Sequence, residues 1–225
     1  MHLQDEKRQR LAQTYDFAEN PISQDVWRHA AATYTEGHLY IKGQDVMADW
    51  ERPYMQSLAR IAASNSGTVL EVGFGMGISA DYVQSNPIEK HIIIEANLDV
   101  FERLKIYAQT AAKPVEPRSG FWQEVIPSIP DESIDGILFD TCPINEVETV
   151  ITYAVPFFKD AHRILKKGGI FTYFSAEVED YSSEHLQLLK NAGFDSIDKE
   201  VIQLSTPADC EYWSSSTMVA PIIRK

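Results

Sequence analysis

Short apolar runs alternate with stretches of helical periodicity from residue 68 to the end of the chain. The apolar runs are TVLEV (68–72), KHIIIE (90–95), IDGILF (134–139) and IFTYFS (170–175). The helical stretches between and after them are 77–86, 99–112, 147–167 and 182–194. This alternation predicts an α/β fold, in which helices cover both faces of a mostly parallel sheet.

Two more apolar runs, 199–205 and 216–223, close the chain and are expected to form an antiparallel pair at the sheet edge. Gly168 and Gly169 are expected to end the third helix, because glycine is favoured just beyond a helix C-terminus. Ligands of such sheets bind beyond the carboxyl ends of the strands. Gly73, Glu95, Asp140 and Ser175 follow the parallel runs and are therefore expected on one rim.

The N-terminal part differs from the rest in its pattern. Residues 1–45 are polar with interleaved aromatic side chains, which favours a lid of helix and loop over the core. Residues 45–64 read as helical, since Met47, Trp50, Tyr54 and Leu58 recur at helical spacing. We therefore expect a single globular unit, with a lid segment over 1–45 and the main domain over 46–225.

Composition excludes several classes of function. The net charge of −13 disfavours nucleic-acid partners. It indicates either a solvated acidic surface or electrostatic attraction of a cationic ligand. No apolar run has the length of a membrane span, and the polar N-terminus does not read as a secretory signal. Two cysteines and six scattered histidines make neither a disulfide framework nor a metal site, so we expect a cytoplasmic protein without metal.

The segment EVGFGMG (71–77) places Gly73, Gly75 and Gly77 at a strand-to-helix turn. Glycine permits positive φ and lets a ligand approach the backbone closely. Glu95 follows about 20 residues later, at a strand end, where an acid holds the ribose of a nucleotide. This spacing fits NAD and S-adenosylmethionine alike. The irregular glycine pattern, the acid Glu71 before the first glycine and the antiparallel closing strands favour S-adenosylmethionine.

Two acids stand in apolar settings that call for an explanation. Asp140 ends the run GILFD (136–140), and Glu51 lies within MADWERPYM (47–55). Asp140 also fits a strand-end turn former, and Glu51 a solvated helix residue. We hypothesise that the two acids act together on one substrate.

Several motifs resemble the guanidinoacetate N-methyltransferase family, from about Trp27 to the C-terminus. They are VMADWERPYM, VLEVGFGMGIS, PIEKHIIIEAN, GFWQEV, IDGILFDTCP, RILKKGGIFTY and PADCEYW. The resemblance implies a seven-stranded Rossmann-like methyltransferase sheet and S-adenosylmethionine as methyl donor, with S-adenosylhomocysteine as product. It also implies a small guanidine compound as the substrate.

The resemblance further implies the residues that hold the methyl donor. Side chains that pack on it are Trp27, Met47 and Met55. The loop around its amino-acid part follows Glu71 and comprises Gly73, Phe74, Gly75, Met76, Gly77, Ile78, Ser79 and Ala80. Glu95 holds the ribose, flanked by Ala96 and Asn97, and Phe121, Trp122 and Gln123 lie near the adenine. For Met47, Met55 and Trp122, plain core packing is the alternative role.

In the family, two acids hold the guanidino group, and they match Glu51 and Asp140. Two carboxylates offset the repulsion between a guanidinium and a cationic sulfonium, which is about 4 kcal/mol at 4 Å for an effective dielectric near 20. They also align the N–H groups as a fork. Asp140 is assigned as the proton acceptor and Glu51 as the orienting acid.

The chain departs from the family after the strand 170–175, where its segment is shorter and acidic. Ser175, Ala176 and Glu177 are expected to contact the far end of the substrate. Glu177 or Glu179 would suit an amine, which favours arginine or agmatine over guanidinoacetate. A solvated acidic loop is the alternative.

Other functions compete with this hypothesis. A protein-arginine or other amine methyltransferase shares the same motifs, and a non-catalytic protein that binds S-adenosylmethionine would not need both acids. An NAD enzyme would need a catalytic His, or a Tyr/Lys pair, near the rim, whereas His162 and His185 read as surface helix residues. The oligomeric state is left open, with a homodimer among the options.

Overall fold

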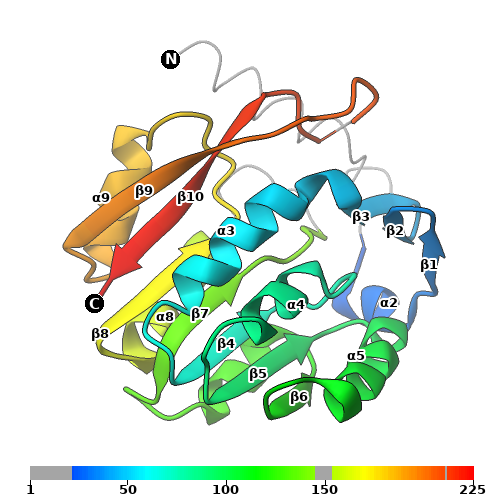
Figure 1. Ribbon diagram of the computed structural model, residues 1–225, viewed down its shortest axis with the longest axis horizontal. Coiled ribbons are helices and arrows are strands. Elements are labelled where there is room, and N and C mark those ends of the chain that lie inside the picture. Colours follow the sequence, from blue (N-terminus) through cyan, green and yellow to red (C-terminus); the bar gives the residue numbers. More distant parts are fainter. Residues whose placement is uncertain (1–21, 145–153, 211) are drawn as a thin grey trace.

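A seven-stranded sheet forms the centre of the protein, whose computed structural model describes residues 22–144, 154–210 and 212–225 (Figure 1). The strands are β4 (Thr68–Val72), β5 (Lys90–Glu95), β6 (Val115–Ser119), β7 (Ile134–Phe139), β8 (Leu165–Tyr173), β9 (Ser196–Gln203) and β10 (Thr217–Arg224). Their order is β6-β5-β4-β7-β8-β10-β9. Neighbours from β6 to β8 pair in parallel, whereas β10 is antiparallel to β8 and β9. The predicted fold class is confirmed.

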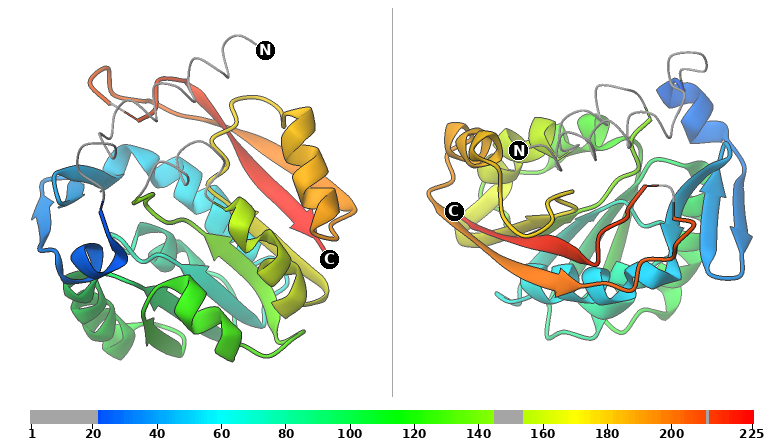
Figure 2. Two further views of the ribbon diagram at one scale, coloured as in Figure 1. Left: turned by 180° about the vertical axis from the view of Figure 1, so that it is seen from behind. Right: turned by 90° about the horizontal axis from the view of Figure 1, so that it is seen from above.

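Alternate residues of the central strands support two separate helix layers, as the two-residue period of a strand requires. Val69, Ile93 and Leu138 pack in the core on one face. That face is covered by α3 (Arg52–Ala62), α4 (Ile78–Gln84) and α5 (Leu98–Thr110). The other face is covered by α6 (Trp122–Val125), α8 (Phe158–Ile164) and α9 (Ser183–Asn191), with the short 3-10 turns Ile126–Ser128 and Val155–Phe157 (Figure 2).

One strand of the seven-stranded sheet was not expected from the sequence. β6 has the sequence VEPRS, which contains a proline and no apolar run. It pairs with β5 alone at the edge of the sheet, where a proline needs no ladder partner. Hydrophobic pattern alone therefore gave no signal for it.

The expectation of helix and loop over residues 1–45 holds for the helix over 24–29 but is wrong for residues 32–45, which form strands and hairpin turns. After α2 (Gln24–His29), a second sheet follows, made of β1 (Ala32–Thr35), β2 (His38–Ile41) and β3 (Gln44–Ala48). Gly37 and Gly43, both at φ +79, make the two hairpin turns. Met47 thus lies on a strand and not on the predicted helix 45–64. Its spacing to Trp50 and Tyr54 continued the helical period across the true boundary, where the 3-10 turn Asp49–Glu51 leads into α3.

The predicted helix end at Gly168 and Gly169 is also wrong. α8 ends at Ile164, and both glycines belong to β8. The N–H of Gly168 donates to the Lys225 carbonyl at 2.7 Å, and the N–H of Lys225 donates to the Gly169 carbonyl at 3.1 Å. These glycines join the C-terminal end of the chain to the sheet instead of capping a helix. The first part of the predicted helix, 147–153, lies outside the described residues.

Within the described ranges, no helix combines the length and the apolar character that a membrane crossing needs.

Gly136 sets how closely α3 packs on β7. A Cβ at this position would come within 1.8 Å of the Ala62 carbonyl oxygen at the end of α3. We predict that Gly136→Ala lowers the free energy of unfolding by about 2–3 kcal/mol, because helix and strand must separate. Urea denaturation measures this loss.

Gly168→Ala is the matched control, since a Cβ there would meet nothing within 4 Å. Its φ of +79 still costs an alanine about 1 kcal/mol. Equal losses in the two variants would contradict the steric explanation for Gly136.

Candidate functional site

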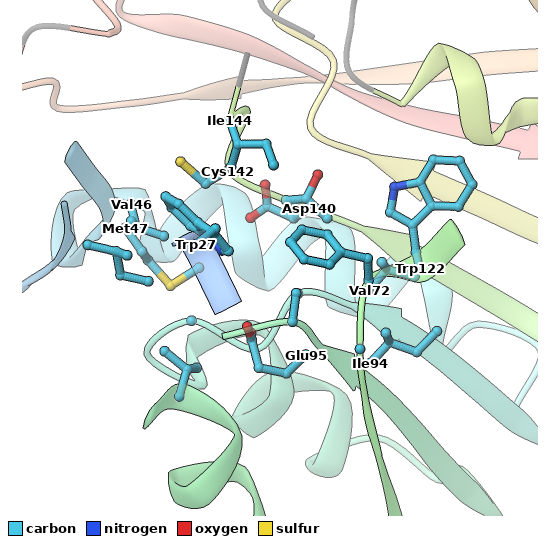
Figure 3. A pocket seen from close by; sticks show the side chains of 18 of the residues that line it. Trp27, Val46, Met47, Val72, Ile94, Glu95, Trp122, Asp140, Cys142 and Ile144 are labelled. Carbon is cyan, nitrogen blue, oxygen red and sulfur yellow. The ribbon is translucent and has the colours of Figure 1, made fainter. Parts of the chain in front are cut away.

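A cavity opens where β4, β5 and β7 end and the small sheet of β1–β3 begins (Figure 3). Its polar groups include Glu95 and Asp140, from the ends of β5 and β7. Trp27 and Met47 lie on one side of it and Trp122 on the other. The cavity therefore joins the rim of the main sheet to the N-terminal segment that the sequence suggested as a lid.

The glycine turn after β4 is packed directly against Asp140. Gly73 has φ +94, and a Cβ there would come within 1.9 Å of the Asp140 carbonyl oxygen. The Asp140 N–H in turn donates to the Val72 carbonyl at 2.9 Å. Only glycine fits this contact, which places the turn and the acid on the same wall of the cavity.

Glu95 organises the turn from the opposite side. Its Oε2 accepts a hydrogen bond from the Phe74 N–H at 3.0 Å, and its Oε1 accepts one from the Asn97 N–H at 2.7 Å. Burial raises the pKa of Glu95, although these N–H groups oppose the shift. The carboxylate thus fixes the backbone on both sides of the cavity while it lines the cavity itself.

The small sheet and α2 are attached to the rim by polar contacts. The Asn97 side chain donates from Nδ2 to the carbonyls of Trp27 and Ala30, at 2.9 and 2.8 Å. Tyr34 donates its hydroxyl to the Gly75 carbonyl at 3.3 Å, and the Met76 N–H approaches the Met47 sulfur at 3.3 Å. Residues 22–48 are therefore held over the glycine turn.

Asp140 is only partly exposed, at the end of an apolar strand. Burial raises its pKa to about 7, and the negative charge of Glu71 adds to the shift. A carboxyl group in this state accepts a proton readily near neutral pH.

Glu51 is 4% exposed and ends the 3-10 turn Asp49–Glu51 before α3. Its Oε1 accepts hydrogen bonds from the Ala48 N–H at 2.9 Å and from the Tyr212 hydroxyl at 2.7 Å. Burial raises its pKa to about 8, and the carboxylate of Asp140 contributes to that rise. The two acids thus interact electrostatically, although Glu51 is not among the residues that line the cavity.

Glu71 faces away from the cavity, into the core. It is fully buried, accepts a hydrogen bond from the Ser79 hydroxyl, and lies 2.8 Å from His91 Nε2. Neither Glu71 nor Ser79 lines the cavity. This buried group ties α4 to β4 and β5 beneath the glycine turn, and His91 is its unexpected member.

The segment after β8 is held by its own contacts. The Ser175 hydroxyl donates to the Val219 carbonyl at 2.7 Å, and Ala176 has φ +54. Glu177 Oε1 accepts from the Ser182 N–H at 3.1 Å and lies 3.0 Å from His185 Nδ1. Burial disfavours the charge of Glu177, but these hydrogen bonds bring its pKa below the ordinary value.

His185 was read from the sequence as a surface residue, and this is wrong. It is 2% exposed, and its Nε2 lies 2.6 Å from the Tyr173 hydroxyl. Its place on α9 turns it toward β8 and Glu177, whereas sequence spacing did not show which face of the helix is covered.

The predicted residues divide into two sets by their position. Those that line the cavity are Trp27, Met47, Gly73, Gly75, Glu95, Ala96, Phe121, Trp122, Gln123 and Asp140. Those that do not are Glu51, Met55, Glu71, Phe74, Met76, Gly77, Ile78, Ser79, Asn97, Ser175, Ala176 and Glu177. Unexpected lining residues include Leu39, Ile41 and Val46, which were missed because their strands were read as loop or helix. Among the described residues, no group of His, Cys, Asp and Glu has the arrangement of a metal site.

Comparison with known proteins gives a family match over nearly the whole chain. A family model described as guanidinoacetate N-methyltransferase matches residues 15–225. Curated relatives include protein arginine N-methyltransferase 2 of Yarrowia lipolytica, 31% identical over 64% of this chain and 31% of that protein. The namesake of Saccharomyces cerevisiae is 28% identical over 71% of this chain and 40% of that protein. The match thus spans only a third to two fifths of these relatives.

Solved structures agree in fold at low sequence identity. Spermidine synthase from Thermotoga maritima superposes with a TM-score of 0.58 at 16% identity, over 88% of this chain and 72% of the other. The Burkholderia thailandensis 1,6-didemethyltoxoflavin-N1-methyltransferase, solved with S-adenosylhomocysteine, gives a TM-score of 0.53 at 15% identity, over 77% of both chains.

The two buried glutamates of the rim give contrasting predictions. Glu95→Gln replaces an acceptor oxygen in the cavity with an amide group, and we expect it to weaken binding of S-adenosylmethionine at least about tenfold. Glu71→Gln leaves the cavity unchanged but removes the charge that faces His91. For this variant we expect little change in the affinity for S-adenosylmethionine and a loss of about 1–3 kcal/mol in the free energy of unfolding.

Titration calorimetry and urea denaturation of both variants test this pair. If Glu71→Gln weakens binding more than Glu95→Gln does, Glu71 contributes to binding as the sequence first suggested.

Proposed function

The chain belongs to the guanidinoacetate N-methyltransferase family of S-adenosylmethionine-dependent enzymes, and we propose that it methylates the guanidino nitrogen of a small guanidine compound. The observation that carries this proposal is a pair of acids, Glu51, which is buried, and Asp140, which is partly exposed in the cavity. They come from distant parts of the chain, and the charge of Asp140 raises the pKa of Glu51. Such a pair is suited to a planar cation that hydrogen-bonds to both.

The groups that line the cavity support binding of S-adenosylmethionine. Glu95 offers carboxylate oxygens for the ribose hydroxyls, and Gly73 and Gly75 expose backbone beside it. Phe121 and Trp122 supply aromatic surface for the adenine. When bound, S-adenosylmethionine supplies an electrophilic methyl carbon on a cationic sulfonium.

The two acids can compensate the positive charges that the guanidinium and the sulfonium bring into the site. A guanidinium is protonated in water and does not attack through a protonated nitrogen. Glu51 and Asp140, when ionised, compensate the charge of the substrate and align its N–H groups. Asp140 then accepts the proton that the guanidino nitrogen loses as it gains the methyl group. Its pKa of about 7 matches that task at neutral pH.

The contacts of Glu177 bear on the chemistry of the substrate's tail. The earlier hypothesis placed an amine near Glu177, but His185 and the Ser182 N–H already bind that carboxylate. Glu179 is exposed on the same segment. The contacts of Glu177 therefore give no support for a cationic tail over the carboxylate of guanidinoacetate.

A protein arginine is the second candidate substrate, because the curated relatives are named protein arginine N-methyltransferase 2. Those proteins are much longer than the matched region, so their substrate does not transfer directly. The hydrogen bond from Tyr212 to Glu51 favours a small substrate here, because it places the β9–β10 connection against that acid.

Turnover on a panel of guanidines decides between these candidates. We expect methylation of at least one of guanidinoacetate, arginine and agmatine by labelled S-adenosylmethionine, with the methyl group found on a guanidino nitrogen by mass spectrometry. Asp140→Asn should lower kcat about 100- to 10,000-fold, because the proton acceptor is lost. Methylation of arginine-containing peptides but of none of the small guanidines would overturn the proposal.

The pH dependence of kcat/KM gives an independent prediction. Both acids must be ionised to bind the cation, and burial raises their pKa values to about 7 for Asp140 and about 8 for Glu51. We expect kcat/KM to fall as the pH drops through this range, with a limiting slope approaching two protons, since the guanidinium itself does not titrate there.

In Glu51→Gln the limiting slope should approach one proton. A wild-type profile that is flat between about pH 6 and 9 would contradict a role for the ionised pair.

A further inference from the structure

The carboxyl group of Glu51 is held by a hydroxyl that lies far away in the sequence. Tyr212 donates to Glu51 Oε1 at 2.7 Å, and the Ala48 N–H donates to the same oxygen at 2.9 Å. Oε2 receives neither bond. One oxygen is thus anchored from two sides, while the other takes part in neither of these bonds.

The Tyr212 ring is held in place by its own packing and by contacts of the β9–β10 connection that carries it. It packs against Trp50, next to Glu51, with ring centroids 5.7 Å apart. The neighbouring Trp213 packs edge-on against Phe174 at 6.4 Å. The ends of the connection are joined by the Leu204 N–H, which donates to the Ser216 carbonyl at 2.8 Å. The hydroxyl is therefore aimed at Glu51 by packing.

The hydrogen bond has a definite electrostatic effect. Burial and the charge of Asp140 both favour the protonated form of Glu51, whereas the Tyr212 hydroxyl and the Ala48 N–H favour the ionised form. A donor to a carboxylate stabilises its charge more than a donor to a neutral acid does. Removal of the hydroxyl leaves Glu51 with the Ala48 N–H alone against burial.

We propose that Tyr212 is a positioning residue of the substrate site, which favours the ionised form of Glu51 and directs the second carboxyl oxygen of Glu51 toward the guanidinium. This inference rests on the proposed function, because it gives Glu51 a cationic partner. It assigns to the β9–β10 connection a part in substrate binding that the cavity lining did not indicate.

Other titratable groups surround Glu51 and are considered with it. They are Asp45 from β3, Asp140 after β7, Tyr54 from α3, and Cys210 beside Tyr212. Burial raises the pKa values of Tyr54 and Cys210, so both stay neutral near pH 7. Asp45 and Asp140 remain in every Tyr212 variant. A change in the pKa of Glu51 on removal of the Tyr212 hydroxyl therefore reports on that hydroxyl.

Tyr212→Phe tests the inference, because it keeps the ring against Trp50 and removes only the hydroxyl. Tyr181→Phe is the matched control, since the Tyr181 hydroxyl donates to the Asp198 carbonyl, at 2.8 Å, instead of to Glu51. The first readout is the pKa of the Glu51 carboxyl by ¹³C NMR of glutamate-labelled protein, with Glu51→Gln to assign its resonance. We expect Tyr212→Phe to raise this pKa by about one unit or more, and Tyr181→Phe to leave it unchanged.

The second readout is kcat/KM for the guanidine that the wild type methylates. At about pH 7 we expect the kcat/KM of Tyr212→Phe to be about tenfold below that of the wild type. Most of this loss should disappear at alkaline pH, where Glu51 is ionised again. In Glu51→Gln, the added Tyr212→Phe change should cost little more. These results support the inference.

An unchanged pKa of Glu51, or a loss of activity that is equal at all pH values, overturns it while leaving the proposed function in place. Wild-type protein that methylates no guanidine instead overturns the proposed function, and the NMR readout still reports on the bond between Tyr212 and Glu51.

Discussion

The structure is organised around the burial of two acids of like charge, Glu51 and Asp140, near each other at one end of a parallel sheet. Burial alone disfavours both negative charges, and each raised pKa reflects this cost. A cation that hydrogen-bonds to both relieves it. Under the proposed function, a guanidinium would stabilise both negative charges, which would link substrate binding to proton release.

The scaffold brings these acids together through close backbone contacts. Asp140 follows β7 and its backbone packs against the glycine turn at Gly73, so the proposed donor site and the proposed proton acceptor share one wall. Glu51 precedes α3, whose end packs on β7 at Gly136. One helix therefore connects the position of Glu51 to the strand that carries Asp140.

The same site is closed by segments from both ends of the described chain. The β1–β3 sheet is attached to the glycine turn through Tyr34, Met47 and Asn97. The β9–β10 connection reaches Glu51 through Tyr212. The β1–β3 sheet thus borders the cavity, while the β9–β10 connection contacts Glu51.

The sequence by itself determined the alternation of strands and helices, the glycine turn, and the acids at strand ends, because each depends on local period or on a single residue type. The positions of Glu95 and Asp140 on one rim follow from the parallel sheet. The hydrophobic pattern of the sequence did not show β6 or the small sheet of β1–β3, whose strands are short or polar.

Only the tertiary structure decided which acids face the cavity. Glu71 and Glu95 both end or nearly end a strand, yet Glu71 faces His91 in the core while Glu95 lines the cavity. Successive strand residues point to opposite faces, and the register of neighbouring strands sets which partner each one meets. Likewise, the bond from Tyr212 to Glu51 spans 161 residues. No local pattern records such a contact, because packing of distant segments creates it.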